Sequence, residues 1–392
     1  MITLRGIAWN NTRSYVPLIA ASQRFEELHP DVQIAWDKAS LSTLLDDTNT
    51  AFQKDYDLVV ATNGWIDYCS RQGLLAPLDE WLNMRTLQEQ EMNSVGQSFK
   101  SYQTSHHQWA LAIDASSQVS AYRPDLLRRN NFEIPQSWKD AVNMSACYDF
   151  AIPLTNQDVL AHFYAIYMTL AAYQGVKDKD LFNRSIAEES IELLTELCSN
   201  IDKACFNWSS VQVFEAMTTT DQFVYCPLGF GYSNYAKTSY VTHPLKFCDT
   251  PYLVNKQRIF GSMGGSGIAI NESSQYKRLA ARFIEFISSP RVQTNFIVNF
   301  GGQPGCRRAW LNPAANEATG DYFINTLAAQ DRAAIRPRLH FPMESLKQAG
   351  NLIRNHLKRP KNSQLVARQL AVLSHQTDTK NLSSSPSCIG SF

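Results

Sequence analysis

Residues 109–127 read WALAIDASSQVSAYRPDLL, and this stretch decides the organisation that we expect for the whole chain. An apolar run ends at Ile113, Asp114 and a pair of serines follow it, and an extended apolar pattern then resumes. The pattern predicts a strand, a polar break and a second strand, because alternating apolar and β-branched residues are typical of strands. Pro124 favours an extended residue before it and can begin the next helix.

Polar residues between two strands in mid-sequence are typical of a chain that crosses from one lobe to another. Such a crossing would place Asp114 and Ser116 beside an interlobe cleft, where small ligands preferentially bind. A surface turn inside a single domain is the alternative, because turns often have this composition.

The length and the charge balance limit the possible functions. The chain has 392 residues, enough for two lobes, because single cores stop growing at roughly 250 to 300 residues. Lysine plus arginine and aspartate plus glutamate number 36 each, so no overall field attracts nucleic acid or an anionic membrane. We therefore expect a small, uncharged or weakly charged partner and no nucleic acid.

The chain begins MITLRGIAW, without the basic region and apolar core of an export signal, and no run of about 18 apolar residues predicts a membrane span. Its eight cysteines show neither zinc spacing nor a C-x-x-C pair, so we expect no metal and no cofactor. Unpatterned cysteines suit a reducing compartment. The sequence as written predicts a cytoplasmic protein, or a periplasmic or extracellular one if the start is trimmed or misassigned.

Short strands alternate with helices in the first part of the chain, which predicts an α/β lobe with a mostly parallel sheet. Strands are expected at 3–9, 32–36 and 58–61. Ligands bind beyond the carboxyl ends of such strands. The polar and aromatic residues that follow the first and third strands are Trp9, Asn11, Arg13, Asn63 and Trp65. The two tryptophans are alternatively core residues.

The second half contains helical patterns, an aromatic loop and a glycine-rich segment. Residues 135–200 are mostly helical, and the helix around Tyr164 is apolar nearly all round, as expected for a lobe core. In the loop 228–235, glycines flank aromatic rings that can stack on a ligand. The segment 259–271 predicts a glycine-rich turn that leads into a strand from Gly267 and returns the chain to the first lobe. The tail, 376–392, is predicted to be disordered.

Taken in order, several segments resemble the extracellular solute-binding proteins of ABC transporters, family 1, the maltose-binding-protein-like group. The segments are GIAWNNTRSYVPL, FEELHPDVQIAWD, YDLVVATNGW with GLLAPLDEWL, LAIDASSQVSAYRPDLL, GGSGIAINESS with LAARFIEFISSP, and GGQPGCRRAW. The resemblance covers roughly residues 1–360. It implies a bilobal type 2 periplasmic-binding-protein fold, in which two discontinuous three-layer α/β lobes close by a hinge on a small molecule, usually a carbohydrate.

The resemblance also implies lobe boundaries and ligand-binding positions. Lobe 1 would comprise 1–112 and 264–305, and lobe 2 would comprise 113–263 and 306–375. The implied positions are Trp9, Asn11, Arg13, Asn63, Trp65, Asp114, Ser116, Tyr232 and Tyr235, with Gly265 and Ser266 at the second hinge and Arg307 near the cleft. Asp114 is alternatively a turn residue, and Arg307 with Arg308 is alternatively a solvated pair.

The resemblance suggests an ABC permease as a partner and a monomeric receptor. No nucleophile elbow, zinc-protease motif or dinucleotide fingerprint is present, so we assign no catalytic residue. A cytoplasmic enzyme or enzyme-accessory protein that binds a small metabolite with the same fold is the alternative function.

Overall fold

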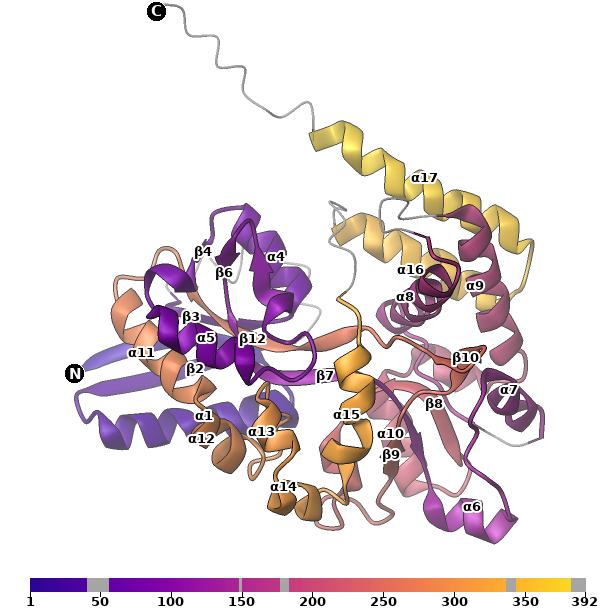
Figure 1. Cartoon of the computed structure of the whole chain (residues 1–392), viewed down its shortest axis with the longest axis horizontal. Helices are drawn as coiled ribbons and strands as arrows, with labels where there is room; N and C mark the ends of the chain where they lie inside the picture. Colours follow the sequence, from indigo (N-terminus) through magenta and orange to yellow (C-terminus); the bar gives the residue numbers. More distant parts are fainter. Residues whose placement is uncertain (41–55, 148–149, 177–182, 336–342, 382–392) are drawn as a thin grey trace, which may run out of the picture.

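The structure is a computed structural model that describes residues 1–40, 56–147, 150–176, 183–335 and 343–381. Two α/β lobes lie side by side, and two strands run between them (Figure 1). These strands are β7 (Leu111–Tyr122) and β12 (Met263–Asn271). The predicted bilobal α/β fold is thereby confirmed.

A single eight-stranded sheet extends through both lobes in the order β2-β1-β3-β12-β7-β8, with β4 paired to β12 and β9 paired to β7. The other strands of this sheet are β1 (Ile2–Trp9), β2 (Val32–Ala39), β3 (Leu58–Ala61), β4 (Leu75–Ala76), β8 (Tyr225–Phe230) and β9 (Lys246–Cys248). Strand β1 pairs in parallel with β2 and β3, but every ladder beyond β3 is antiparallel. The parallel arrangement expected in the first lobe is confirmed for β1, β2 and β3, and the sheet as a whole is mixed because both crossing strands run against their neighbours.

Strand β7 is continuous from Leu111 to Tyr122, so the predicted polar break is wrong. Its first half pairs with β12, and from Gln118 onward it pairs with β8 and β9. Asp114 and Ser116 remain in the strand because their side chains find partners outside the sheet, so no turn is needed to solvate them.

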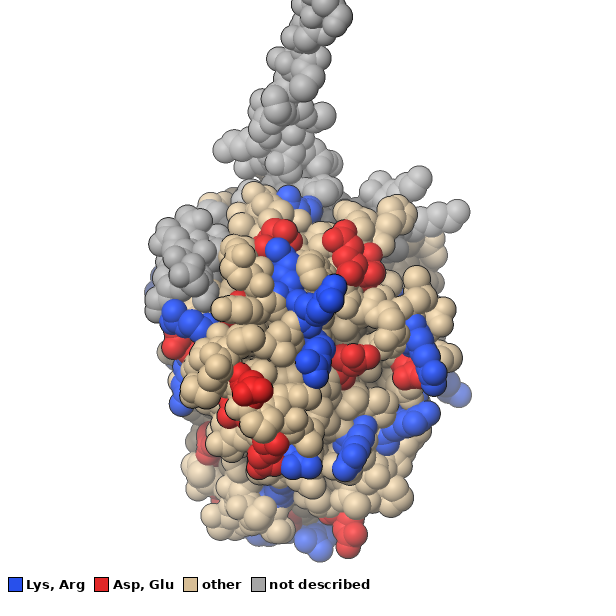
Figure 2. Space-filling model, turned by 90° about the vertical axis from the view of Figure 1, so that its left-hand side faces the viewer, with Lys and Arg blue, Asp and Glu red and all other residues tan. Residues whose placement is uncertain are grey.

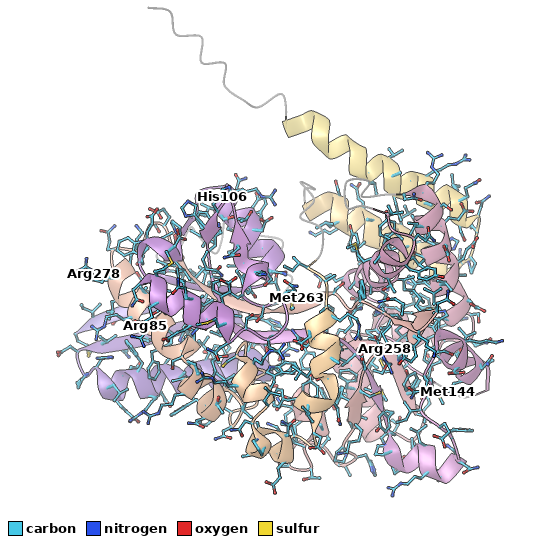
Figure 3. All side chains as sticks on the ribbon, viewed as in Figure 1. Arg85, His106, Met144, Arg258, Met263 and Arg278 are labelled. Atoms are coloured by element: carbon cyan, nitrogen blue, oxygen red, sulfur yellow. The ribbon has the colours of Figure 1, made fainter. Side chains whose placement is uncertain are left out.

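The glycine-rich segment belongs to β12 itself, which begins at Met263 between the lobes (Figure 3). The expected turn before Gly267 is therefore absent. Gly265 has a φ of 111°, and a Cβ added there would lie 2.2 Å from the carbonyl oxygen of Asp114. The glycine permits this close approach of the two crossing strands.

The helices cover both faces of the sheet in the first lobe and form most of the second (Figure 1). They are α1 (Thr12–Leu28), α4 (Asn63–Arg71), α5 (Met84–Met92), α6 (Pro124–Asn130), α7 (Trp138–Cys147), α8 (Asn156–Tyr173), α9 (Arg184–Leu197), α10 (Ser210–Thr219), α11 (Lys277–Ser288), α12 (Pro290–Val292), α13 (Arg307–Trp310), α14 (Pro313–Ala318), α15 (Tyr322–Arg332), α16 (Met343–Lys358) and α17 (Ser363–Asn381). Helix α8 is buried along most of its length, which confirms its prediction as a core helix.

Short elements complete the fold. Two small hairpins, β5 (Gln103–Thr104) with β6 (His107–Gln108) and β10 (Tyr252–Val254) with β11 (Gln257–Arg258), lie outside the main sheet. A π-helical turn (Gln293–Ile297) follows α12, and a 3₁₀ turn (Ser233–Ala236) follows β8.

The first lobe has three layers because side chains alternate along its strands. In β3, Leu58 and Val60 face the cluster that includes α1 and α11, whereas Val59 and Ala61 face the cluster around α4. One large cluster forms the core of the second lobe and includes α8, α9, α16 and α17. The exact lobe boundaries remain a prediction.

Helix α17 extends into the first residues of the segment that was predicted to be disordered. Helix α17 continues to Asn381, past the expected start at residue 376, and residues 382–392 lie outside the described ranges. Buried residues such as Leu370 and Ala371 fix the helix, and helix propagation into the polar end costs little once the first turns are packed.

The charges on the first lobe are mixed. The face shown in Figure 2 carries Lys and Arg side chains interspersed with Asp and Glu side chains. Among the described helices, none combines the length and the apolar character that crossing a membrane requires.

Candidate functional site

Arg13 is a buried arginine in the first turn of α1, directly after the end of β1. Asn11 caps this helix, because its Oδ1 accepts a hydrogen bond from the backbone N–H of Arg13. Arg13 as a whole residue is only 4% exposed. A buried guanidinium is costly without partners, so its contacts define this part of the molecule.

The partners of Arg13 come from the crossing strand and from the second lobe. Its Nη2 donates to Oδ2 of Asp114 at 2.9 Å, and its Nη1 donates to the carbonyl oxygen of Gly231 at 2.8 Å. Ser116 Oγ donates to the same carbonyl at 3.2 Å. The guanidinium carbon also lies 4.1 Å from the centre of the Tyr232 ring. Elements from the two lobes and the strand between them therefore meet at one arginine.

Burial and pairing act together on the ionisation of this site. Burial alone would lower the pKa of Arg13, but the Asp114 carboxylate raises it, and the net pKa is raised. Burial raises the pKa of Asp114, while Arg13 and the Gln303 backbone oppose this rise. Burial also raises the pKa of Tyr232 to about 12. The phenol is therefore neutral near pH 7, and the site holds one ion pair.

Gln303 joins the crossing strand to the second lobe beside this pair. Its Oε1 accepts from the backbone N–H of Ser233 at 2.9 Å. Its Nε2 lies 3.1 Å from both the carbonyl oxygen of Ala115 and the hydroxyl of Tyr322. Since Gln303 is fully buried, these bonds fix the position of the 3₁₀ turn that follows Tyr232.

Several buried polar atoms at this junction lack a hydrogen-bond partner among the described residues. They are Nε of Arg13, Oδ1 of Asp114 and the hydroxyl oxygens of Ser14, Ser117 and Ser233. Buried polar groups are normally paired, so an unpaired group calls for an explanation. Ser14 lies in α1 of the first lobe, and Ser233 lies in the 3₁₀ turn after β8 in the second lobe.

Trp9 also lies at the junction. Its half-buried ring packs against the core of the second lobe and against the α4 side of the first, and Arg13 lies 5.8 Å from its centre. Gly265 and Ser266 lie where β12 pairs with Ala115 and Asp114 of β7. Five of the expected positions therefore meet directly: Trp9, Arg13, Asp114, Ser116 and Tyr232.

Three expected positions have other surroundings. Trp65 is 1% exposed in the core of the first lobe, so its ring is not available for stacking in this structure. Tyr235 packs in the second core, and its hydroxyl donates to Glu215 at 2.9 Å. Arg307 forms an ion pair with Asp331. In each case, the neighbouring core or carboxylate explains the residue without a ligand.

Asn63 is the first residue of α4, and its Oδ1 accepts from the N–H of Gly64. It is half-buried, and its side chain bonds to its own helix rather than to the Arg13 pair. The sequence pattern missed Gln303, Ser14 and Ser233. Only Gln303 had a visible indication, because it lies in the glycine-rich segment GGQPG.

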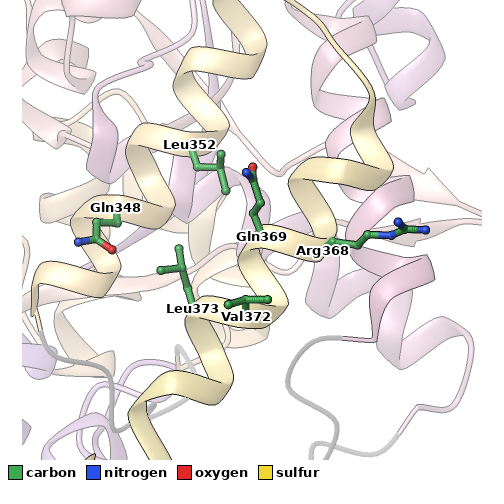
Figure 4. A pocket seen from close by; sticks show the side chains of 6 residues that line it. All are labelled: Gln348, Leu352, Arg368, Gln369, Val372 and Leu373. Carbon is green, nitrogen blue, oxygen red and sulfur yellow. The ribbon is translucent and has the colours of Figure 1, made fainter.

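A metal site and a separate surface pocket are the other possible kinds of functional site in the described residues. No group of three or more His, Cys, Asp or Glu side chains in the described ranges could hold a metal ion. A surface pocket of about 370 Å³ lies between α16 and α17 (Figure 4). Its lining residues are Gln348, Leu352, Arg368, Gln369, Val372 and Leu373. The pocket lies on the second lobe alone, unlike the Arg13 junction.

Comparison with solved structures identifies the class of fold. Maltose-bound MalE3 of T. maritima superposes with a TM-score of 0.82 at 14% identity, covering 97% of this chain and 100% of that chain. An ABC-transporter solute-binding protein of Agrobacterium radiobacter in complex with ribitol gives 0.79 at 16% identity, covering 97% and 98%. UgpB of Mycobacterium tuberculosis in complex with glycerophosphocholine gives 0.79 at 13% identity, covering 97% and 99%. The chain thus has the bilobal fold of these binding proteins.

The family follows from the sequence. The model of the bacterial extracellular solute-binding protein family matches residues 20–314, which is more than half of the chain. The protein belongs to this family, as the sequence resemblance predicted. A search of curated protein sequences found no match.

Proposed function

We propose that this solute-binding protein holds a small molecule of the sugar or polyol class between its lobes, at the junction around Arg13. The observation that carries the proposal is the contact of one buried arginine with Asp114 on the crossing strand and with Gly231 in the second lobe. A solute that contacts both lobes binds the closed state better than the open state, so binding shifts the population toward closure.

The chemistry of the junction suits hydroxyl groups. Arg13 Nε is an unused donor, and the Ser14 and Ser233 hydroxyls can each donate or accept. A sugar hydroxyl can also do both, while the rings of Trp9 and Tyr232 can pack against the apolar face of a sugar. Proteins with this fold have been described in complex with maltose and with ribitol, which supports the same class of ligand.

We include Trp9, Asn11, Arg13, Asn63, Asp114, Ser116 and Tyr232 in the proposed site. Gly265 and Ser266 belong to the proposed hinge. The lobes are proposed as 1–112 with 264–305, and 113–263 with 306–375. Trp65, Tyr235 and Arg307 are left out, because their side chains are engaged in the core or in an ion pair.

We further propose that the receptor is monomeric and has an ABC permease as its partner, in keeping with its family. The alternative, proposed from the scattered cysteines of the sequence, is a cytosolic protein with reduced thiols that serves a purpose other than import. Cell fractionation with thiol alkylation tests the location, and recovery of the protein in a periplasmic fraction would overturn it.

A thermal-shift screen over sugars, polyols and small organic acids, followed by calorimetry, tests the proposed function. Ser116→Ala and Ser120→Ala form a matched pair on β7, because both buried hydroxyls donate to a carbonyl of the second lobe. The Ser116 variant should bind the solute about 2- to 10-fold more weakly, equivalent to one lost hydrogen bond, whereas the Ser120 variant should bind normally. Equal effects of the two variants would place the site elsewhere, and turnover of the solute would overturn the receptor function.

A further inference from the structure

The Arg13–Asp114 pair makes the junction electrically neutral. The two side chains are 5% and 2% exposed, and Nη2 of Arg13 lies 2.9 Å from Oδ2 of Asp114. Within the described residues, the other groups that act on this pair are uncharged: the phenols of Tyr232 and Tyr322 and the backbone of Gln303. The positive charge that would attract an anionic ligand is therefore already balanced.

Charge balance matters here because the pair is shielded from water. An ion buried without a counter-ion costs several kcal/mol, and removal of one partner of a buried pair is strongly destabilising. An anionic solute beside Arg13 would add a second negative charge next to Asp114. An uncharged solute would leave the pair intact and could use Arg13 Nε, which has no partner among the described residues.

We propose that Asp114 is a built-in counter-ion for Arg13 that restricts this site to uncharged solutes and excludes phosphate esters and carboxylates. This inference rests on the proposed function, because it assigns the charge of the ligand at the same site. The fold alone does not decide whether a phosphate group is accepted, since one similar structure was described with ribitol and another with glycerophosphocholine, which contains a phosphodiester.

The first test compares matched ligands on the unmodified protein. Calorimetric titrations would use mannitol against mannitol 1-phosphate, and ribitol against ribitol 5-phosphate. The proposal predicts at least about 100-fold weaker binding for the phosphate-bearing member of a pair. Equal or tighter binding of a phosphate-bearing member would overturn the proposal and leave solute binding at the junction intact.

The second test removes the counter-ion and needs no identified solute. Asp114→Asn leaves Arg13 unpaired, so formate, acetate or inorganic phosphate should raise the Tm of this variant by several degrees more than sodium chloride at equal ionic strength. The unmodified protein and the double variant Arg13→Gln/Asp114→Asn should show no such gain. In the Asp114→Asn variant, the preference for the uncharged probe should also fall at least about tenfold.

Asp125→Asn is the matched control for the second test. Its partner Arg123 is fully buried, but Arg123 also pairs with Asp221, so a counter-ion remains when Asp125 is neutralised. This control should gain nothing from added anions. An equal gain in the control, or no gain in a folded Asp114→Asn variant, would contradict the proposal. If Asp114→Asn fails to fold, the ligand pairs on the unmodified protein still decide the question. If the unmodified protein binds none of the four probes but Asp114→Asn is rescued by anions, the proposed function fails for these solutes while the counter-ion role stands.

Discussion

Gln118 and His162 form a buried hydrogen bond of 2.7 Å that connects the crossing strand β7 to the core helix α8. The other ring nitrogen of His162 lies 2.8 Å from the carbonyl oxygen of Pro153, which can only accept. The proton of the neutral ring is therefore assigned to Nε2, and Gln118 donates to Nδ1. Gln118 Oε1 in turn accepts from the N–H of Ser262, next to the start of β12. This network ties both crossing strands to the second lobe.

The His162 network predicts a pH dependence of stability. Burial lowers the pKa of His162 from 6.5 to about 4, so the folded protein binds this proton less tightly than the unfolded chain does. Between these values the unfolded state carries more protons, and the free energy of unfolding therefore decreases as the pH falls from about 6.5 to about 4. The expected loss from this group is roughly 2–4 kcal/mol. Urea unfolding across this pH range, compared between the unmodified protein and His162→Gln, measures it.

His243→Gln is the control, because His243 is exposed. It should retain the pH dependence, whereas His162→Gln should lose most of it. An unchanged slope in the His162 variant would show that other groups cause the acid sensitivity.

Trp9 and Trp65 should respond differently to truncation. Trp65→Ala removes a fully buried ring from the first core and should cost about 3–5 kcal/mol of stability. Trp9→Ala removes a half-buried ring at the junction and should cost less stability, but about 1–3 kcal/mol of solute affinity. Chemical denaturation and calorimetry on the two variants separate these effects. A Trp65 variant that keeps its stability and loses its affinity would restore the interpretation suggested by the sequence.

Gly265 should be the least replaceable glycine on the crossing strands. Gly265→Ala adds a Cβ against the Asp114 carbonyl at a φ of 111°, and should destabilise the protein by about 2–4 kcal/mol. Gly64→Ala is the control, because nothing lies within 4 Å of its added Cβ and the residue is in the first turn of α4. This control should change stability by less than about 1 kcal/mol. Equal unfolding midpoints for the two variants would refute the close approach of β7 and β12.

Gln303 should contribute strongly to the stability of the junction although it carries no charge. Gln303→Ala leaves the Ser233 N–H and the Ala115 carbonyl without this buried partner, and should cost about 2–4 kcal/mol of stability. Gln222→Ala, which removes an exposed glutamine bonded to Asp202, should be close to neutral. Denaturant unfolding measures both variants, and a neutral Gln303 variant would mean that the junction is held by other contacts.

The sequence allowed much of this fold to be predicted, for physical reasons that particular residues illustrate. Leu58, Val59, Val60 and Ala61 identify a buried strand by composition, and His29-Pro30 marks the end of α1. The continuity of β7 could not be predicted, because Asp114 and Ser116 are compatible with a strand only when Arg13 and Gly231 supply partners. Those partners lie about one hundred residues away in the chain, on either side of Asp114 and Ser116.

Only part of the candidate site could be predicted, again because contacts between residues distant in the chain decide the surroundings of each side chain. Position after a strand end identified both Trp9 and Trp65, but it could not show which ring faces the junction and which enters the core. That difference arises because α4 turns Trp65 inward against the sheet. Ser14 and Ser233 were missed because a buried hydroxyl without a partner is recognisable only from tertiary contacts.

Hydrogen–deuterium exchange with a saturating solute from the screen tests the central claim most directly. The account predicts slower exchange in peptides that cover residues 9–15, 112–118 and 229–236, because these segments of both lobes enclose the solute. Peptides from α16 and α17 should exchange at the same rate with and without solute. Protection confined to the pocket between α16 and α17, or no protection of the Arg13 segments despite calorimetric binding, would contradict the account.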